Sequence, residues 1–495
     1  MTRTIEIKFL AQPQLNDTFS YKLSLNGAPF TYVTTPFVNK QYLTVNSAPS
    51  GIKLGADLTQ TISNTFNDLN DHNYHPAVSY SLSGNSILAT ITYTGTLTLY
   101  DVVVPSGIMA IGDLNSDIFF DGGINTQTLR KAYNNDIIVF GAGPGTEPLH
   151  ATVEAAGMNI RLFPDPAEKF TINMKPYIST LINTRYFEDR LLPWLDAVSP
   201  STYVYRSNNG CYLELEVKFT IALPNNQLAQ AIHNLAWFAG VEQPGYSNSF
   251  SRNELYVLTP FSAETANRYY IKYWQGYPFD FTLYSTSLSV MFKNTANLLS
   301  QSFDTEEQVS RIVLSDGRTD ETIENLLPLA TGYNIIRLMR SSAETEADKF
   351  LVLDKVPFNK GVYLKWLNKY GGYSYWLFEN TYTIDRSTKQ LGELDRDNAN
   401  VETMKTRTIG MGKTSQDSIK IITELLEPHE RDIVEGLLDS PKIYLFAGKP
   451  FSRVEAASWI EVSLKTTSAR LKNARQPLTS FSFDIELPER YTQTL

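Results

Sequence analysis

Cysteine and histidine are scarce in this chain of 495 residues, which has one cysteine, Cys211, and five histidines. A single cysteine excludes an intrachain disulfide, which fits folding in a reducing compartment. Cys211 follows an Asn–Asn–Gly turn and opens a predicted strand. A nucleophilic thiol would need a base and an oxyanion site, so we interpret Cys211 as structural.

Metal and cofactor motifs are also incomplete. His72 and His75 have ligand-like spacing, but they precede Pro76 in a predicted loop, and zinc needs further ligands. Asp316–Asp320 lacks the full calcium-loop series. Gly141–Gly145 has no helix after it and does not match a dinucleotide fingerprint. We therefore expect no metal, no cofactor and no catalytic residue.

Charge and long apolar runs are sparse as well. Charged residues make up 19% of the chain, and the formal net charge is −9. An acidic chain repels phosphate backbones, so nucleic acid is not an expected partner. No window approaches the roughly 18–20 apolar residues of a spanning helix, and the first 14 residues do not match a signal peptide. We expect synthesis in the cytoplasm and no membrane insertion.

Aromatic residues are plentiful: they form 12% of the chain, with 28 Tyr and 26 Phe. Both types favour strands, and Tyr also favours protein interfaces. The length predicts about three domains. We predict a mainly β fold of sandwich-type domains, each with one flanking helix, over residues 1–150, 151–330 and 331–495.

Residues 1–150 alternate apolar and polar side chains in two predicted hairpins, 19–34 and 78–93, around a helix at 57–69. The Gly- and Pro-rich stretch 141–148 predicts a linker, which places a boundary near 150. The order hairpin, helix, hairpin is similar to a small β-module of phage tail and baseplate proteins.

Residues 151–330 alternate clearly at 212–219, which predicts a strand with one wet face. Leu228, Ile232, Leu235 and Ala236 have helical spacing and predict a helix at 226–239. Residues 304–318 are polar and predict a connection. Further strands are predicted at 170–174, continuing into 175–178, and at 254–259, 268–274, 279–284 and 288–292.

Residues 331–495 predict a hairpin at 361–379 with a Gly–Gly turn, and a helix at 428–438 between Pro428 and the Ser–Pro pair that ends it. Further strands are predicted at 335–339, 350–354, 442–446, 459–465 and 479–487.

The hairpin carries the candidate site, a cluster of aromatic residues that form core, a subunit interface or a glycan-stacking platform: Tyr363, Trp366, Tyr373, Tyr375 and Trp376. Alternation places Tyr363 and Lys365 on one face of the first strand and Trp366 on the other.

The hairpin, the helix after Glu430, the strand Lys442–Leu445 and the closing strand Phe481–Glu486 together form a pattern. It resembles the ring-forming domain of distal tail proteins of long-tailed phages, most closely those of Bacteroidetes phages and prophages. The resemblance implies a β-sandwich with a helix, close to the tail-tube fold, that assembles into a hexameric ring. In that family the domain usually comes first, whereas here the pattern is last.

From this resemblance we expect a structural virion protein that is not an enzyme, made in the host cytoplasm and built into the tail. It would be a ring-forming distal-tail or adaptor (baseplate) subunit that links the tail tube to the tip, with tube, hub, tip or fibre proteins as partners. The alternative is a glycan-binding receptor module at the tail tip, and a tail-associated hydrolase is a third hypothesis.

Overall fold

In the computed structural model the chain forms two compact units. Unit 1 comprises residues 1–182, 213–238 and 242–252, and unit 2 comprises residues 183–212, 239–241 and 253–495. The residues that the structure describes are 2–14, 18–25, 28–38, 52–53, 56–71, 78–92, 97–103, 109–113, 118–143, 147–182, 187–189, 204–206, 210–223, 228–243, 250–260, 268–305, 308–316, 327–340, 349–379, 382–395, 408–452, 454–466, 469–471 and 478–494.

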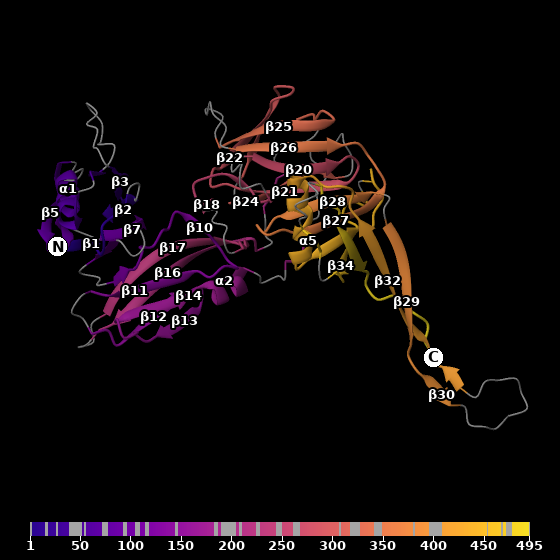
Figure 1. The fold of residues 1–495 in the computed structure, drawn as a ribbon, viewed down its shortest axis with the longest axis horizontal. Coiled ribbons are helices and arrows are strands. Elements are labelled where there is room, and N and C mark those ends of the chain that lie inside the picture. Colours follow the sequence, from indigo (N-terminus) through magenta and orange to yellow (C-terminus); the bar gives the residue numbers. More distant parts are fainter. Residues whose placement is uncertain are drawn as a thin grey trace, which may run out of the picture. The chain divides into compact units, whose positions relative to one another are not determined.

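Unit 1 consists mainly of strands (Figure 1). Its strands are β1 (Thr2–Phe9), β2 (Thr18–Leu25), β3 (Ala28–Val38), β4 (Ile52–Lys53), β5 (Val78–Ser83), β6 (Ser86–Thr92), β7 (Leu97–Val103), β8 (Met109–Asp113), β9 (Ile118–Phe120), β10 (Thr128–Lys131), β11 (Ile137–Ala142), β12 (His150–Ala155), β13 (Met158–Leu162), β14 (Lys169–Asn173), β16 (Tyr212–Ala222), β17 (Leu228–Phe238) and β18 (Phe250–Ser251), and its helices are α1 (Leu58–Asp71) and α2 (Lys175–Ile182).

Two sheets of unit 1 pack face to face. One has the strand order β14-β11-β9-β8-β1-β6-β5 and the other the order β13-β12-β16-β17-β10-β18, as far as the described residues go. The ring of Phe219 on β16 lies 5.0 Å from the rings of Phe120 on β9 and Phe140 on β11, with edge-to-face geometry. Because the apolar side chains alternate along each strand, these rings fill the space between the layers.

Strand β17 replaces the helix predicted at 226–239, so that prediction is wrong. Ala229, His233 and Leu235 are buried while Ile232 is 46% exposed, which is the two-residue period of a strand and not the face of a helix. Parallel pairing with β10, in register at Leu129 and Ala236, overrides the local helical spacing.

Helix α2 begins where the strand at 170–174 was predicted to continue. The backbone N–H of Lys175 donates to Asn173 Oδ1 at 3.1 Å, and Pro176 follows in the first turn, where its missing N–H costs little. Ile178 and Ile182 then bury one face of the helix.

Unit 2 is also built from strands. Its strands are β15 (Val204–Arg206), β19 (Tyr256–Val257), β20 (Arg268–Trp274), β21 (Pro278–Tyr284), β22 (Ser289–Asn294), β23 (Ser300–Asp304), β24 (Val309–Asp316), β25 (Gly332–Met339), β26 (Lys349–Val356), β27 (Gly361–Leu367), β28 (Tyr373–Glu379), β29 (Tyr382–Gln390), β30 (Glu393–Asp395), β31 (Thr408–Gly410), β32 (Lys413–Ile422), β33 (Ile443–Phe446), β34 (Trp459–Leu464) and β35 (Ser482–Glu486), and its helices are α4 (Pro428–Val434) and α5 (Gly436–Asp439).

A layer of aromatic rings forms the core of unit 2. Trp274 on β20 lies edge-on to Trp376 on β28, with ring centroids 5.0 Å apart. Phe279 on β21 lies 5.0 Å from Tyr375 on β28, and Tyr277 lies 4.5 Å from Tyr363 on β27. These contacts join β20 and β21 to the hairpin β27–β28, so the abundance of Tyr, Phe and Trp is used for packing between sheets.

The mainly β class is confirmed, as are most of the predicted strands and both helices at 57–69 and 428–438, the latter divided into α4 and α5. The polar connection predicted over 304–318 is wrong. Strand β24 occupies 309–316 and pairs with β21. Its apolar residues Val309, Ile312 and Val313 are buried, and Arg311 is buried with them.

The two units differ from the three predicted segments. Residues on both sides of position 150 lie in unit 1, where β11 pairs with β14. Residues on both sides of position 330 lie in unit 2, where β22 pairs with β25. Part of the predicted linker, residues 144–146, lies outside the described residues.

Trp366 provides a test of this core. Its side chain is completely buried, so Trp366→Ala should lower the free energy of unfolding by roughly 3–5 kcal/mol. Leu425→Ala, at a side chain that is 65% exposed, is the matched control and should change it by less than about 0.5 kcal/mol. Urea unfolding measures both, and equal effects would contradict the proposed packing.

Candidate functional site

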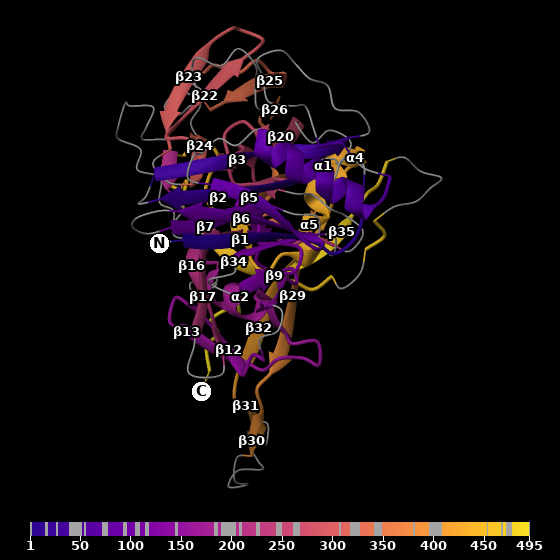
Figure 2. The same ribbon diagram turned by 90° about the vertical axis from the view of Figure 1, so that its left-hand side faces the viewer.

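Two strands of unit 2, β29 and β32, form an exposed arm. They pair antiparallel from Tyr382↔Ile421 to Gln390↔Lys413 without a break in register. The short ladder of β30 and β31 continues beyond them (Figures 1 and 2). The arm therefore consists of two strands, with the chain turning back through β30 and β31.

Ionic contacts hold the arm to the chain end that runs beside it. Asp417 on β32 accepts hydrogen bonds from Arg386 Nε at 2.6 Å on one side and from Arg490 Nη1 at 2.8 Å on the other. The hydrogen bond from Arg386 is the main reason that the pKa of Asp417 is held below its usual value. The backbone N–H groups of Leu487 and Arg490 donate to carbonyl oxygens of β32, so β32 is paired on both sides.

Strand β29, by contrast, is the last strand of its sheet, in the order β28-β27-β33-β34-β35-β32-β29. All nine of its residues are exposed, and no other described strand pairs with its outer edge. Ile384 is 63% exposed and Tyr382 is 44% exposed. A long, exposed edge strand with apolar side chains is a template for pairing with another chain.

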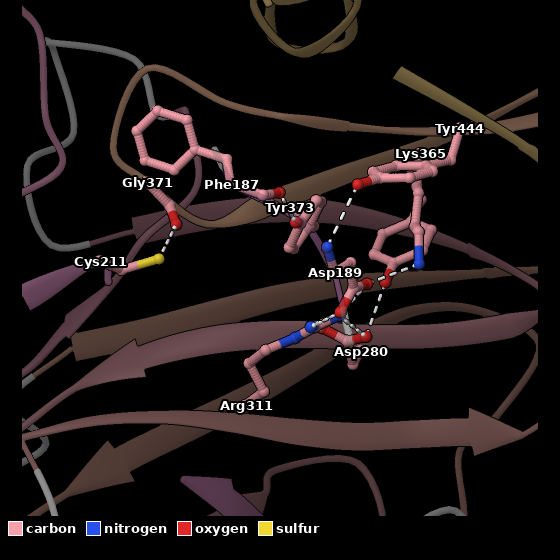
Figure 3. Close-up of polar contacts among 10 residues, drawn as sticks. Phe187, Asp189, Cys211, Asp280, Arg311, Lys365, Gly371, Tyr373 and Tyr444 are labelled. Atoms are coloured by element: carbon pink, nitrogen blue, oxygen red, sulfur yellow. Dashed lines mark hydrogen bonds and ion pairs between the residues drawn. The ribbon is translucent and has the colours of Figure 1, made fainter. Parts of the chain in front are cut away.

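A second feature of unit 2 is a cluster of four charged side chains in its interior (Figure 3). Arg311 on β24 donates to both oxygens of Asp280 on β21, at 2.9 and 2.6 Å. It also donates to both oxygens of Asp189, at 2.7 and 3.3 Å. Lys365 on β27 donates to Asp189 Oδ2 at 2.6 Å. Two cations thus meet two carboxylates, and the cluster is neutral.

The cluster is almost completely shielded from water. The side chains of Asp189 and Arg311 are each 2% exposed, and those of Lys365 and Asp280 are 6% and 9% exposed. Aromatic side chains enclose it: Arg311 lies 4.7 Å from the ring centroid of Tyr373, and Lys365 lies 4.2 Å from that of Trp459. A charge buried here without an oppositely charged partner would destabilise the folded state by several kcal/mol.

Tyrosine hydroxyls complete the hydrogen bonding. Tyr375 donates to Asp280 Oδ2 at 2.6 Å, and the backbone N–H of Asp189 donates to the hydroxyl of Tyr444 at 3.1 Å. Tyr373 donates to the carbonyl oxygen of Phe187 at 3.1 Å. The cluster therefore joins β21 and β24 to the hairpin β27–β28, to β33 and to the segment 187–189.

The pKa values follow from this arrangement. Burial alone would raise the pKa of Asp189, but the charges of Arg311 and Lys365 outweigh it and hold the pKa well below its usual value. Burial lowers the pKa of Lys365, and Asp189 opposes that shift. Burial and the nearby Asp280 together hold the pKa of Tyr375 far above its usual value. The tyrosine is therefore a neutral donor at neutral pH.

The structure brings the five predicted site residues together in the interior of unit 2. Tyr373 and Tyr375 contact the charged cluster, Tyr363 and Trp376 lie in the aromatic layer, and Trp366 is completely buried. All five are between 0% and 5% exposed. A sugar ring stacks on an exposed aromatic face, and these rings present none within unit 2. Interface and glycan-stacking roles for them stay predictions.

The four charged residues of the cluster were missed from sequence. Asp280 and Lys365 each stand in a largely apolar strand, which is the signal that could have identified them as buried. Arg311 lacks that signal, because its strand also contains Ser310, Ser315 and Asp316. Asp189 carries no such signal, because its partners are separated from it by 122 and 176 residues.

Cys211 is buried, and its thiol donates to the carbonyl oxygen of Gly371 at 2.8 Å. In the described part of the chain, no three His, Cys, Asp or Glu side chains are grouped to hold a metal, and no helix has the length and apolarity needed to cross a membrane. His72, His75 and residues 317–320 of the candidate calcium loop lie outside the described residues.

No family model and no curated protein matches this chain. Among solved structures it is similar to fibronectin(III)-like modules of Clostridium thermocellum CbhA, at 9% identity and a TM-score of 0.16, over 48% of this chain and 94% of that one. It is also similar to a bacterial ice-binding adhesin, at 7% identity and a TM-score of 0.13, over 70% of this chain and 88% of that one. At these TM-scores the likenesses assign neither a fold family nor a function.

Removing one carboxylate tests the charged cluster. Asp189→Asn leaves Arg311 and Lys365 with one carboxylate between them, so the free energy of unfolding should fall by roughly 3–5 kcal/mol. Adding Lys365→Met restores the charge balance and should recover part of the loss. The control Glu461→Gln breaks a pair in which the carboxylate is 55% exposed, and should cost at most about 1 kcal/mol. Chemical denaturation of the three variants measures these differences.

The same carboxylate predicts acid sensitivity. Because the folded-state pKa of Asp189 lies below its usual value of 3.8, its stabilising contribution is complete above that value and is lost as pH falls through the folded-state pKa. Stability should therefore decrease between about pH 4 and pH 2 more steeply in the native protein than in Asp189→Asn. Identical slopes in unfolding measured across this range would contradict the assignment.

Proposed function

We propose that this protein is a structural subunit of a phage-type tail, a ring-forming distal-tail or adaptor (baseplate) protein that links the tail tube to the tip. The observation that carries the proposal is the outer edge of β29, which is exposed along its whole length and has no partner among the strands that the structure describes. Such an edge in a stable protein needs a partner strand or a charged surface to prevent uncontrolled association.

The side chains on β29 support a specific partner. Asp385, Arg386 and Lys389 place both signs of charge on the strand, while Ile384 and Tyr382 expose apolar surface. Charges of both signs favour one register of pairing with a partner strand over other registers. The apolar side chains would be buried when that strand binds. A closed ring would cover such edges on every subunit.

The resemblance described from sequence covers the same part of the chain. The residues that carry the resemblance to the ring-forming domain of distal tail proteins flank the arm: the hairpin at 361–379 precedes it, and the helix at 428–438 follows it. In this role the protein acts without catalysis. Its partners are further copies of itself and the tube, hub, tip or fibre proteins of the tail, and it is located in the virion after synthesis in the host cytoplasm.

The mass of the purified protein tests this proposal. Native mass spectrometry and negative-stain electron microscopy should find a closed oligomer, a hexamer in the ring we propose, or incorporation into particles when the other tail proteins are co-expressed. A chain that stays monomeric and enters no particle would contradict a ring-forming role.

A substitution on β29 tests the arm itself. Ile384→Lys places a charge on the exposed edge without disturbing the core, and should weaken oligomer formation at least about tenfold. Leu288→Lys, at a side chain that is 76% exposed elsewhere in unit 2, is the matched control and should leave the mass distribution unchanged. Equal behaviour of the two variants would assign assembly to another surface.

A further inference from the structure

A pocket of about 210 Å³ opens on the outer face of the first sheet of unit 1. Its lining residues come from the ends of β1, β9, β11 and β14 and from the turns beside them: Leu10, Phe119, Asp121, Phe140–Gly143 and Ala167–Lys169. Strands β11 and β14 are neighbours in this sheet, and both are labelled in Figure 1. Ligands commonly bind in concave surfaces of this kind, with mixed apolar and polar lining.

Strand register explains why the surface is hollow here. Gly141 pairs with Phe119 on one side and with Lys169 on the other. Side chains at paired positions share one face of a sheet, so these three residues form a row across the outer face. The middle position has no side chain, and the gap lies between an aromatic ring and a lysine.

The opposite face of the same strands is core. Phe120, Phe140 and Phe170 are between 0% and 5% exposed, and the ring of Phe140 contacts the rings of the other two. Phe119, in contrast, is only partly buried. An aromatic side chain that points away from the core beside an open gap is not needed for packing between the two sheets.

On its polar side, the pocket is lined by an ion pair that can form further hydrogen bonds. Lys169 Nζ donates to Asp121 Oδ2 at 2.9 Å, and these side chains are 46% and 31% exposed. Among the described residues this is the one polar contact of either side chain, so Asp121 Oδ1 and two ammonium hydrogens remain for a ligand. A carboxylate and an ammonium together bind hydroxyl groups, which both donate and accept.

The rim of the pocket is held in one conformation. Asp165 Oδ1 accepts the backbone N–H groups of Ala167 and Lys169 at 2.8 and 2.9 Å. Glu168 between them has a φ of 59°, a left-handed conformation that is unfavourable for a residue other than glycine and that the surrounding hydrogen bonds maintain. A preorganised rim lowers the entropy cost of binding.

We propose that this pocket binds one neutral sugar ring of a glycan. Phe119 provides the aromatic face on which the C–H groups of a pyranose stack, and the Asp121–Lys169 pair provides partners for its hydroxyl groups. The volume is below the roughly 300–1,000 Å³ of sites for larger ligands, which suits one ring. Asp121 and Glu168 outnumber Lys169, so a phosphate or another anion is disfavoured.

Saturation-transfer NMR on the full chain tests the site, with the methyl glycosides of glucose, galactose, mannose and N-acetylglucosamine as probes. We expect saturation transfer to at least one of them. Phe119→Ala should weaken that binding at least about tenfold. Phe163→Ala removes an aromatic ring that is 71% exposed outside the pocket, and this matched control should bind as the native protein does.

Gly141→Leu is a second, independent variant, because it fills the pocket and leaves the charged pair intact. A Cβ atom at Gly141 would lie 3.4 Å from the nearest atom, the carbonyl oxygen of Glu168, at the edge of ordinary contact. If this variant does not fold by circular dichroism, Asp121→Asn takes its place. No transfer to any of the four glycosides, or unchanged binding in the folded variants, would overturn the proposal.

This binding is measured on a single chain and does not depend on assembly. A protein that forms rings but transfers no saturation would refute the sugar site alone. A protein that binds a glycoside but stays monomeric would refute the ring-forming role alone.

Discussion

Arg311 lies between two carboxylates in the interior of unit 2, and the strands around it depend on that arrangement. Its guanidinium makes paired hydrogen bonds to Asp280 and to Asp189, and Lys365 supplies the second positive charge. Buried charges are tolerated only when every partner is present. The cluster therefore requires β21, β24, β27 and the segment 187–189 to meet in one geometry, which favours a single arrangement of these elements.

The exposed arm belongs to the same sheet as part of this cluster. Lys365 stands on β27, and the sheet continues through β33, β34, β35 and β32 to β29. Near one end of the sheet, the charged side chains of the cluster are buried and hydrogen-bonded to one another. At the other end, the outer edge of β29 has no partner strand among the described residues. The buried cluster and the exposed edge of β29 are therefore connected through one continuous sheet.

Much of the fold followed from local pattern. The alternation at 212–219 and the aromatic hairpin with its Gly–Gly turn became β16 and the pair β27–β28, because a two-residue period matches a sheet whatever surrounds it. The helix predicted at 226–239 failed because its apolar residues fit two periods, and pairing with β10 decided between them. Strand β24 was missed because Ser310, Arg311, Ser315 and Asp316 make the segment polar in sequence, whereas burial of Arg311 depends on carboxylates that lie far away along the chain.

Composition by itself determined that this protein is mainly β, aromatic in its core and without an intrachain disulfide, since strand preference and cysteine count are properties of the residues alone. Tertiary structure decided which charges are buried and which edge is left open. Asp189 and Lys365 are separated by 176 residues, and no local pattern encodes a contact between them. The hollow at Gly141 has the same origin: it exists because strand register places a glycine between Phe119 and Lys169.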